Sequence, residues 1–432
     1  MSEASSDNCS GGAGTGDGGG YQRWDRHLQS PEANANQEIW RTYFGGLYRA
    51  NIYLENEKFV NWTGKETLQK QYLAEVRFLR AYFHYYLTQV FGEIPIIDHP
   101  LAPGEIPARS SAEDLYKFII EDLKYCALNG LSAPYGQMEA ANWARATKWA
   151  AEALLARIYL FYSGYYNDAT IGDFTIDSAR YYIDDVINNS GHDLVPEFAS
   201  LWKVPSISEL GDLSQYAGEV NPEVVWSIRF ESTGNPSQWL QRMIGPRHTN
   251  IDPYGQGWGA IPVLPTLWNK YNNEDKRKTA TILSWDDEGI VYNYVAQQQA
   301  QYTGYNAKKY DIVSIGGQTE VSDWQKDCSE DFIIIRFADV LLMGAELHLL
   351  TGDNSGAVSY FNRVRTRAFG NDSHNLSSVT IDDIMNERQL ELACEGLRYW
   401  DILRSCKGDF SKLVSILTYV DESDGGDFSQ TA

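Results

Sequence analysis

Three glutamates near the carboxyl end of the chain, Glu387, Glu391 and Glu395, are spaced four residues apart within the segment ERQLELACEGLRYWDILR (387–404). Residues with this spacing share one face of a helix, so the pattern predicts a row of carboxylates, as general acid and base catalysis would need. Arginines are interleaved with the glutamates, however, and that mixture favours a structural network of ion pairs. The arginines are Arg388, Arg398 and Arg404. We therefore interpret the segment as structural.

Other catalytic patterns are missing from the sequence. It contains no GxSxG, HExxH or P-loop motif, and its glycine-rich GTGDGGG stretch neither follows a predicted strand nor opens a helix. Seven histidines are scattered singly, and two of them, His84 and His348, fall within predicted helices and are interpreted as structural. No spacing singles out a pair of glycosidase carboxylates. We predict no catalytic residue and no metal site.

Helical periodicity dominates two zones, which must supply the rigid elements around any site. The predicted helices cover residues 37–56, 65–91, 111–128, 142–164 and 176–189 in the first zone, and 336–351, 355–368 and 380–404 in the second. Ser110 to Glu113 has the pattern of a capping box before the third helix. Small residues such as Ala146, Ala150 and Ala153 on the buried face of the fourth helix let neighbouring helices approach closely.

Residues 190–331, between these zones, are rich in glycine, proline, asparagine and aromatic residues, with short apolar runs such as EVVWSIRF (223–230). We predict loops, short strands and a few helices there, and binding residues are commonly found on such loops. Residues 1–36 are glycine-rich and acidic, and their composition alone predicts disorder. The stretch from Asp7 to Asp17 suggests a structural Ca²⁺, but its spacing is not that of an EF-hand, and a solvated loop is favoured.

Charge and cysteine content limit the function classes. The chain has 36 Lys and Arg residues against 58 Asp and Glu residues, a net charge of −22, which argues against a nucleic-acid partner. Its five cysteines have no metal-binding spacing, and their odd number indicates no disulfide framework. No apolar run reaches the roughly 18 residues that a membrane-spanning helix needs.

Three long segments, in this order along the chain, closely resemble the RagB/SusD family. They are EVRFLRAYFHYYLTQVFGEIPII (75–97), IRFADVLLMGAELHLLTGDNSGAVSYFNRVRTRA (335–368) and the glutamate-rich 387–404 segment. The resemblance continues through residues 146–164, 257–278 and 302–310. It implies a fold dominated by α-helices, in which hairpins of the tetratricopeptide type form a scaffold with an irregular, loop-rich excursion containing short strands.

The resemblance also implies one integrated domain. Its predicted parts are a loop segment at the ligand face (1–36), an amino-terminal helical-repeat half (37–189), the aromatic excursion (190–331) and a carboxyl-terminal helical-repeat half (332–432). Members of the family are lipid-anchored glycan-binding proteins on the outer membrane of bacteria that forage on polysaccharides.

Aromatic residues are the positive signal for such a role. The chain has 13 tryptophans and 28 tyrosines, whose flat rings stack on the apolar faces of sugars. Aromatics within helices or family segments are assigned to the core: Trp143, Trp149, Tyr159, Trp258, Trp268, Tyr399 and Trp400. The loop aromatics are candidates for binding: Trp24, Trp239, Tyr254, Trp285 and Trp324. The placement of glycan sites in the family adds Asp7, Arg23, His27, Asn250 and Asp252.

The resemblance implies a non-catalytic protein that captures oligosaccharide and passes it to a TonB-dependent transporter of the SusC type. Two alternatives stay open: a helical-repeat scaffold that partners the transporter without a ligand of its own, and, less favoured, a glycoside hydrolase. A surface-exposed outer-membrane lipoprotein is expected to begin with a signal peptide and an acylated cysteine. No apolar stretch precedes Cys9, so we interpret the chain as a fragment of such a protein or as the product of a gene model that starts late.

Overall fold

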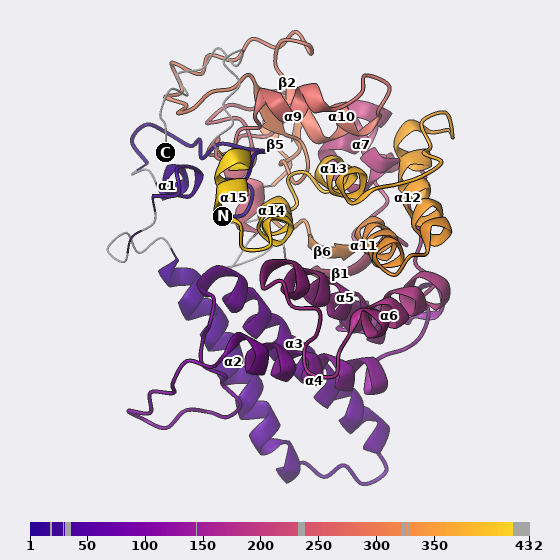
Figure 1. Ribbon diagram of the computed structural model, residues 1–432. Coiled ribbons are helices and arrows are strands. Elements are labelled where there is room, and N and C mark those ends of the chain that lie inside the picture. Colours follow the sequence, from indigo (N-terminus) through magenta and orange to yellow (C-terminus); the bar gives the residue numbers. More distant parts are fainter. Residues whose placement is uncertain are drawn as a thin grey trace. The chain divides into compact units, whose positions relative to one another are not determined.

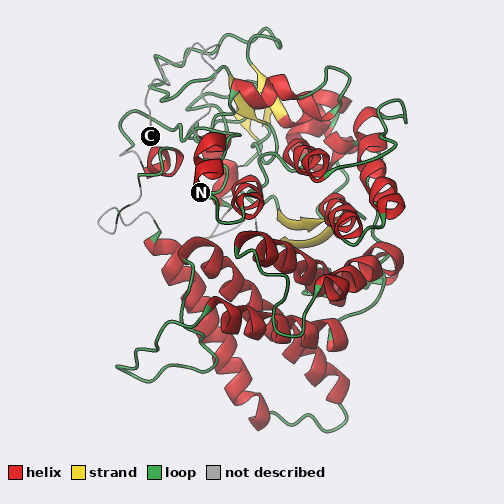
Figure 2. Ribbon diagram, viewed as in Figure 1, coloured by secondary structure: helices red, strands yellow, loops and turns green. Residues whose placement is uncertain are grey.

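The computed structural model describes residues 1–17, 20–28, 30, 36–143, 145–231, 238–321, 323, 325 and 328–417. The described chain is mainly helical, with few and short strands, as predicted (Figures 1 and 2). It divides into two compact units. The first unit comprises residues 1–30, 193–349 and 353–432, and the second unit comprises residues 31–192 and 350–352. The prediction that all parts form one integrated domain stays a prediction.

The second unit is a succession of helices, each of which packs against the next along the chain (Figure 1). These helices are α2 (Gln37–Asn56), α3 (Glu66–Phe91), α4 (Ala112–Asn129), α5 (Lys148–Tyr165) and α6 (Ile176–Asn189). Short 3-10 turns occupy Glu57–Phe59, Tyr135–Gln137 and Ala140–Asn142. Four helices lie within one residue of their predicted bounds, because their apolar periodicity is uninterrupted.

The predicted start of α5 and the predicted capping box of α4 are wrong, and local hydrogen bonds explain both. Helix α5 begins at Lys148, not at residue 142, because the Thr147 side chain accepts a hydrogen bond from the Ala150 N–H at 3.1 Å and so caps the helix there. Helix α4 is capped by Ser111, whose hydroxyl accepts from the Asp114 N–H at 3.1 Å. The Ser110 hydroxyl instead accepts from the Ile96 N–H at 3.2 Å.

Helix α5 forms the centre of this unit's core. Its small and aliphatic positions, Ala150, Ala153 and Leu154 among them, are fully buried. The two tryptophans assigned to the core near this helix differ in burial. Trp149 is buried as predicted, whereas Trp143 is 40% exposed and its assignment to the core is wrong. Trp143 follows a 3-10 turn and precedes the start of α5, so it does not share the helix's buried face.

A buried polar cluster joins α3 to α4 and to the loop after α3. Arg80 binds both carboxylate oxygens of Asp122, at 2.7 and 2.9 Å. The His84 Nδ1 donates to the Arg80 carbonyl at 2.9 Å, and its Nε2 accepts from the Ile97 N–H at 3.1 Å. Both ring nitrogens are satisfied in the neutral form, so His84 is structural. Burial lowers the pKa of His84 to about 4.

This histidine predicts a pH dependence for the second unit. The unfolded chain protonates His84 near its ordinary pKa of 6.5 and the folded chain near 4, so the unfolded state binds more protons between these values. Stability is therefore fully present above pH 6.5 and falls as the pH drops toward 4, by roughly 3 kcal/mol from this group. Urea unfolding of the wild type and of a His84→Gln variant checks it. The variant is expected to lose less stability on acidification, and equal losses would contradict the assignment.

The first unit combines shorter helices with small sheets (Figure 2). Its helices are α1 (Gly20–Asp25), α7 (Lys203–Leu210), α8 (Trp239–Ile244), α9 (Pro265–Lys270), α10 (Arg277–Thr281), α11 (Phe337–Leu350), α12 (Asn354–Phe369), α13 (Ile381–Glu391), α14 (Arg398–Cys406) and α15 (Phe410–Leu417), with 3-10 turns at Phe198–Leu201 and Leu213–Gln215. Among the described residues, the strands pair antiparallel as β1 (Val224–Ile228) with β6 (Phe332–Arg336), β2 (Ile282–Ser284) with β3 (Tyr305–Ala307), and β4 (Ser314–Ile315) with β5 (Gln318–Thr319). None of the described helices combines the length and apolar character needed to cross a bilayer.

The predicted helix over residues 380–404 is two helices, α13 and α14, separated by a turn. In that turn Cys394 has φ of 64° and Gly396 has φ of 83°, values that a continuing helix does not contain. Apolar periodicity continues through the turn, so the break was not visible as a change of pattern. Glu395 therefore lies in the turn and not on the helical face of Glu387 and Glu391.

Residues 1–17 are ordered against the rest of the first unit, contrary to the prediction from composition. Single β-bridges join Cys9 to Val263, Gly12 to Ala260 and Gly14 to Gln299. A Cβ on Gly12, where φ is +60°, would lie 2.2 Å from the Pro262 ring. Glycine is thus required for this close approach. The glycine-rich composition, which is typical of disordered segments, here allows the backbone to pack tightly.

Candidate functional site

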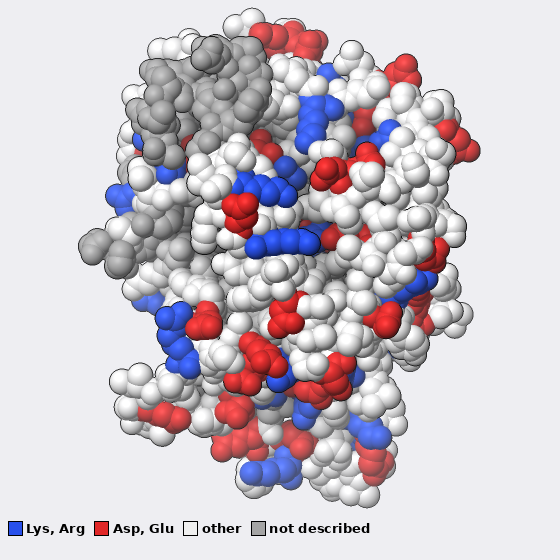
Figure 3. Space-filling view, in the orientation of Figure 1, with Lys and Arg blue, Asp and Glu red and all other residues white. Residues whose placement is uncertain are grey.

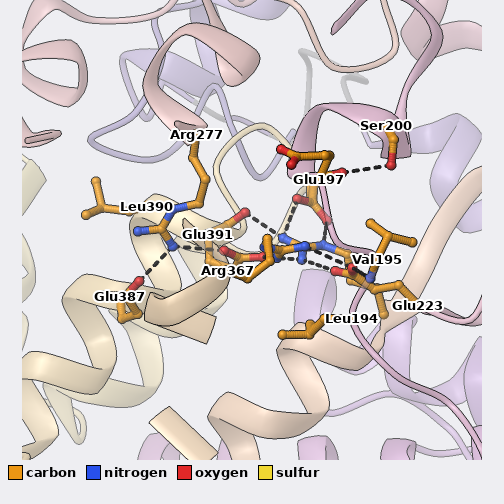
Figure 4. Close-up of polar contacts among 12 residues, drawn as sticks. Leu194, Val195, Glu197, Ser200, Glu223, Arg277, Arg367, Glu387, Leu390 and Glu391 are labelled. Atoms are coloured by element: carbon orange, nitrogen blue, oxygen red, sulfur yellow. Dashed lines mark hydrogen bonds and ion pairs between the residues drawn. The ribbon is translucent and has the colours of Figure 1, made fainter. Parts of the chain in front are cut away.

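Glu387, Glu391 and Glu395 of the 387–404 segment face a buried set of cations. Figure 4 shows Glu387 and Glu391 with Arg277 and Arg367. The set, which we call the buried ion network, contains Glu223, Asp275, Arg277, Lys309, Arg336, Arg365, Arg367, Glu387, Glu391 and Glu395. Its cations come from α10, α12, the end of β6 and the loop after β3, while two of its carboxylates come from α13. The predicted structural ion-pair network is therefore present.

Arg336 and Glu391 are the centre of this network. Glu391 accepts hydrogen bonds from Arg277 at 2.8 Å, from Arg336 at 2.5 Å and from Arg367. Arg336 also binds Glu395, at 2.7 and 2.9 Å. Burial acts to raise the pKa of Glu391, but the guanidinium groups of Arg367, Arg336 and Arg277 outweigh it, and the pKa lies far below its ordinary value. A carboxylate held this way does not serve as a general acid.

The three arginines of the same segment pair with other partners. Arg388 donates to Asp401 at 2.9 Å and to Asp339 at 2.5 Å. Arg404 binds both oxygens of Glu346, at 2.6 and 2.9 Å. Arg398 pairs with Asp7 at 2.7 Å. Most of these ion pairs therefore join different elements, whereas the pair between Arg404 and Asp401, at 2.8 Å, lies within one turn of α14.

Breaking the centre of the buried ion network should destabilise the first unit strongly. Arg336→Met leaves Glu223, Glu391 and Glu395 buried beside fewer cations, and we expect a loss of about 3–5 kcal/mol. Urea unfolding of the folded protein measures the loss. Lys276→Met is the matched control, because its 3.5 Å pair with Glu197 is about half exposed on both sides and should contribute at most about 1 kcal/mol. Equal effects of the two variants would contradict this account.

The predicted binding residues near the amino terminus differ in exposure and in the contacts that they make. Asp7 accepts hydrogen bonds from Arg398 at 2.7 and 2.8 Å. Burial acts to raise its pKa, and Arg398 lowers it to below the ordinary value. Trp24 is half-buried against the core, Arg23 is exposed on α1, and the ring of His27 lies 5.9 Å from that of Tyr399. Asp7 thus anchors the start of α14.

The acidic groups weighed for Ca²⁺ are bound by arginines. Asp7 pairs with Arg398, as above, and Asp17 accepts from Arg247 at 2.9 Å and from the Gly14 N–H at 2.8 Å. These two carboxylates therefore take part in separate ion pairs. The calcium expectation stays a prediction.

Asn250 fixes the backbone of its own loop, and Asp252 joins that loop to β4 and the turn that follows it. The Asn250 Oδ1 accepts from the Gln256 N–H at 2.8 Å. Asp252 accepts from the Ser314 hydroxyl at 2.6 Å and from the N–H groups of Gly316 and Gly317. These bonds, that from Ser314 above all, lower the pKa of Asp252. Both side chains hold loop geometry by hydrogen bonds within the protein.

Tyr254 and Trp285 are each only 1% exposed, so the expectation that their rings face a ligand is wrong for this structure. The Tyr254 hydroxyl donates to Glu288, and the Trp285 Nε1 donates to Asn306 at 3.0 Å. The Trp285 ring is stacked on Tyr292, with 4.6 Å between ring centroids. These aromatics form a small core beneath the loops. Loop position alone did not reveal this burial.

Trp239 is the predicted aromatic that does face solvent. It is 53% exposed, and its ring lies edge-on to Trp258 at 5.9 Å between centroids. The guanidinium of Arg242 lies 3.5 Å from the centroid of Trp239 and 5.3 Å from that of Trp258. We call Trp239, Arg242 and Trp258 the aromatic–arginine cluster. Trp324 lies outside the described residues.

Hydrogen bonds from three segments hold this cluster in place. The Trp258 N–H donates to the Arg242 carbonyl at 3.0 Å, and the Trp258 carbonyl accepts from Arg247, also at 3.0 Å. Helix α8 is anchored where the buried Gln241 side chain meets Glu330, at 3.1 and 3.3 Å. Burial lowers the pKa of Arg242, but a guanidinium stays charged at any physiological pH. The cluster is thus a rigid, cationic surface with one exposed indole.

Such a surface suits a neutral ligand that has both an apolar face and hydroxyl groups. An exposed indole offers its face for stacking, and a neighbouring guanidinium supplies hydrogen-bond donors. Acidic and basic side chains are interspersed over the face of the molecule in Figure 3, so the net negative charge is not gathered there into one patch. Sequence reasoning assigned Trp258 to the core and missed Arg242. The i to i+3 spacing of Trp239 and Arg242 on one helix was the available signal.

Comparisons with known proteins place the chain in a family. Residues 292–427 match the SusD family, and residues 18–160 match a family described as starch-binding and associating with the outer membrane. The chain is 30% identical over 389 residues to the SusD-like protein P2 of Formosa agariphila, covering 85% of this chain and 71% of that protein. The chain therefore belongs to the SusD-like family, as its signature segments predicted.

Two further similarities define the extent of the match. The chain is 28% identical over 382 residues to a SusD-like protein of Bacteroides ovatus, which covers 84% of this chain but only 64% of that relative. A solved structure named laminarin binding SusD-like protein superposes with a TM-score of 0.78, at 23% identity, over 98% of this chain and 89% of that one. This structural likeness establishes the fold, with its paired helices and loop-rich middle.

Proposed function

We propose that this protein binds oligosaccharide or polysaccharide without cleaving it, and that the aromatic–arginine cluster is part of the binding surface. The observation that carries the proposal is the 53% exposed Trp239 indole, held rigidly beside Arg242 and Trp258. A sugar ring stacked on the free face of Trp239 would bury apolar C–H groups, while hydroxyls accept hydrogen bonds from the guanidinium.

Relatives support the glycan as the ligand class. One structural neighbour is a surface glycan-binding protein of Bacteroides thetaiotaomicron in complex with laminarihexaose, and another is a complex with a xylogluco-oligosaccharide. The fold is shared with those proteins at 22% and 24% identity. The buried ion network supports a non-catalytic role, because the carboxylates that looked most like paired acids are consumed by internal ion pairs.

Binding should depend on Trp239. We expect the purified chain to be retarded in native gels cast with one of a panel of glycans that includes laminarin, xyloglucan and starch. Calorimetry with the retarding glycan should then show that Trp239→Ala weakens binding by about 2 kcal/mol, roughly 30-fold, as loss of a central aromatic contact does. Trp143→Ala, which removes a 40% exposed tryptophan of the second unit, is the matched control and should bind as the wild type does.

The other outcomes distinguish the alternatives. Binding that both variants retain would place the ligand away from the cluster. No retardation by any glycan would favour the helical scaffold without its own ligand. Release of reducing sugar from a bound glycan would overturn the non-catalytic role and favour a hydrolase.

We also propose that the protein acts at the bacterial outer membrane, delivering its ligand to a TonB-dependent transporter of the SusC type. The association of a matching family with the outer membrane supports the location. Co-purification of a transporter with the tagged full-length protein from outer membranes tests the partnership. Recovery of the tagged protein without any transporter would contradict it.

A further inference from the structure

Three side chains with metal-binding atoms, none of them part of the aromatic–arginine cluster, meet inside the first unit. They are Glu3 and Cys9 of the amino-terminal segment and Cys394 of the turn between α13 and α14. One donor atom from each lies within 4.8 Å of the other two. Glu3 is 6% exposed, Cys9 is fully buried and Cys394 is 3% exposed. Residues about 385 positions apart in sequence therefore bring two thiols and one carboxylate to a single buried point.

The carboxylate of this group lacks the compensation that buried carboxylates elsewhere in the unit receive. Glu3 accepts hydrogen bonds from the Gly396 N–H at 2.7 Å and from the Asn8 amide at 3.3 Å. Within the described part of the chain, no Lys, Arg or His forms an ion pair with it. Two cations, Lys309 and the amino terminus of Met1, act on Glu3 from a distance, and Lys309 is itself bound to Glu395 at 2.8 Å. A buried anion of this kind is costly unless a cation joins it.

The surroundings of the two thiols also fit a bound cation. Cys9 and Cys394 belong to the hydrophobic core cluster that includes Val263, Leu267 and Ala393. As thiols the two side chains contact each other through a weak hydrogen bond, whereas as metal ligands each gives a thiolate. Two thiolates and a carboxylate together neutralise a divalent cation with one negative charge to spare.

We propose that Glu3, Cys9 and Cys394 bind one divalent cation of the zinc type in a structural site. Thiolate sulfur and carboxylate oxygen are zinc ligands, at about 2.3 and about 2.0–2.2 Å, and neighbouring ligands of a tetrahedral ion lie roughly 3.5–3.8 Å apart. The three donors already lie within 4.8 Å of one another, so small side-chain movements suffice. Ca²⁺ is disfavoured because it takes six to eight oxygen ligands. The fourth position is left for water or another small donor.

Binding would exchange protons for metal. Each thiol gives its proton to solvent as its sulfur binds the cation, so no electron is transferred and no oxidant is needed. The ion would then join residues 3–9 to the turn at 392–397, which also carries Glu395 of the buried ion network. The inferred role is to fasten the amino-terminal segment to that turn.

Metal content tests the proposal directly. The full chain is purified, incubated with zinc chloride and dialysed, and its zinc is measured by plasma mass spectrometry. We expect about one zinc per chain in the wild type, and none in Cys394→Ser and Glu3→Gln. Cys126→Ser, which alters a buried cysteine of the second unit, is the matched control and should retain the metal. Zinc should also raise the melting temperature of the wild type but not that of Cys394→Ser.

Two measurements on the wild type keep the proposal open to refutation if the variants do not fold. Replacement of zinc by Co²⁺ should give thiolate-to-cobalt charge-transfer absorption, and its absence would overturn the assignment. Intact mass after alkylation under denaturing conditions counts free thiols. Five alkylated cysteines with no zinc retained in the native protein would overturn it. A disulfide between Cys9 and Cys394 would overturn the proposed metal site, because its thiols would not be available to a cation. Zinc retained equally by Cys394→Ser would also overturn it, because the ion would then be bound elsewhere.

Discussion

Arg336 and Glu391 meet where almost no water reaches, and the order of the first unit follows from the requirement that both be paired. Removing such charges from water costs several kcal/mol per ion, and only close contact with opposite charges offsets that cost. The partners come from distant parts of the chain: Glu223 before β1, Arg277 at the start of α10 and Arg367 in α12. The aromatic rings of Phe198 and Trp202 lie against the same cations and exclude solvent from them. A small shift in any of these elements would leave a buried charge unpaired.

The same requirement explains the turn between α13 and α14. Arg336 binds the Glu391 side chain, the Glu391 carbonyl and both oxygens of Glu395. Lys309 also donates to the Glu391 carbonyl, at 3.0 Å. A continuous helix would use that carbonyl in its own hydrogen-bond ladder and carry Glu395 past the arginine. Ending the helix at Glu391, with a left-handed glycine at 396, brings carboxylate and carbonyl to the same guanidinium.

Much of the fold could be predicted from the sequence, because long amphipathic helices such as α2 and α6 carry their signal within themselves. The family resemblance supplied the order of the parts. The break after Glu391 could not be predicted, since its cause lies in β6 and the loop after β3, far away in the sequence. The disorder suggested for residues 1–17 failed for a related reason, because glycines at 12 and 14 meet Pro262 and Arg247 only in the folded chain.

The candidate site was predicted only in part. Trp239 was among the predicted residues. Nothing local to Trp285 or Tyr254 indicates that the Trp285 ring turns inward onto Tyr292 and Asn306, or that the Tyr254 hydroxyl is bound by Glu288. Exposure is decided by packing between segments, which a single sequence does not report. Arg242 was not predicted, because an arginine three residues after a tryptophan does not by itself indicate a binding site. Only the structure shows that its guanidinium lies 3.5 Å from the centroid of the Trp239 ring.

The order in which the network's members occur along the chain has a consequence for synthesis on the ribosome. Residues 31–192 form nearly the whole second unit, so that unit can fold as soon as it has emerged. Arg277, Arg336 and Arg367 emerge before the carboxylates of Glu387, Glu391 and Glu395 that pair with them. Before translation has passed residue 395, these arginines have only their earlier partners Asp275 and Glu223, and the amino-terminal segment has no turn between α13 and α14 to pack against. A nascent chain halted short of that point would hold a folded second unit beside an incomplete first one, and it would be open to chaperones and proteases.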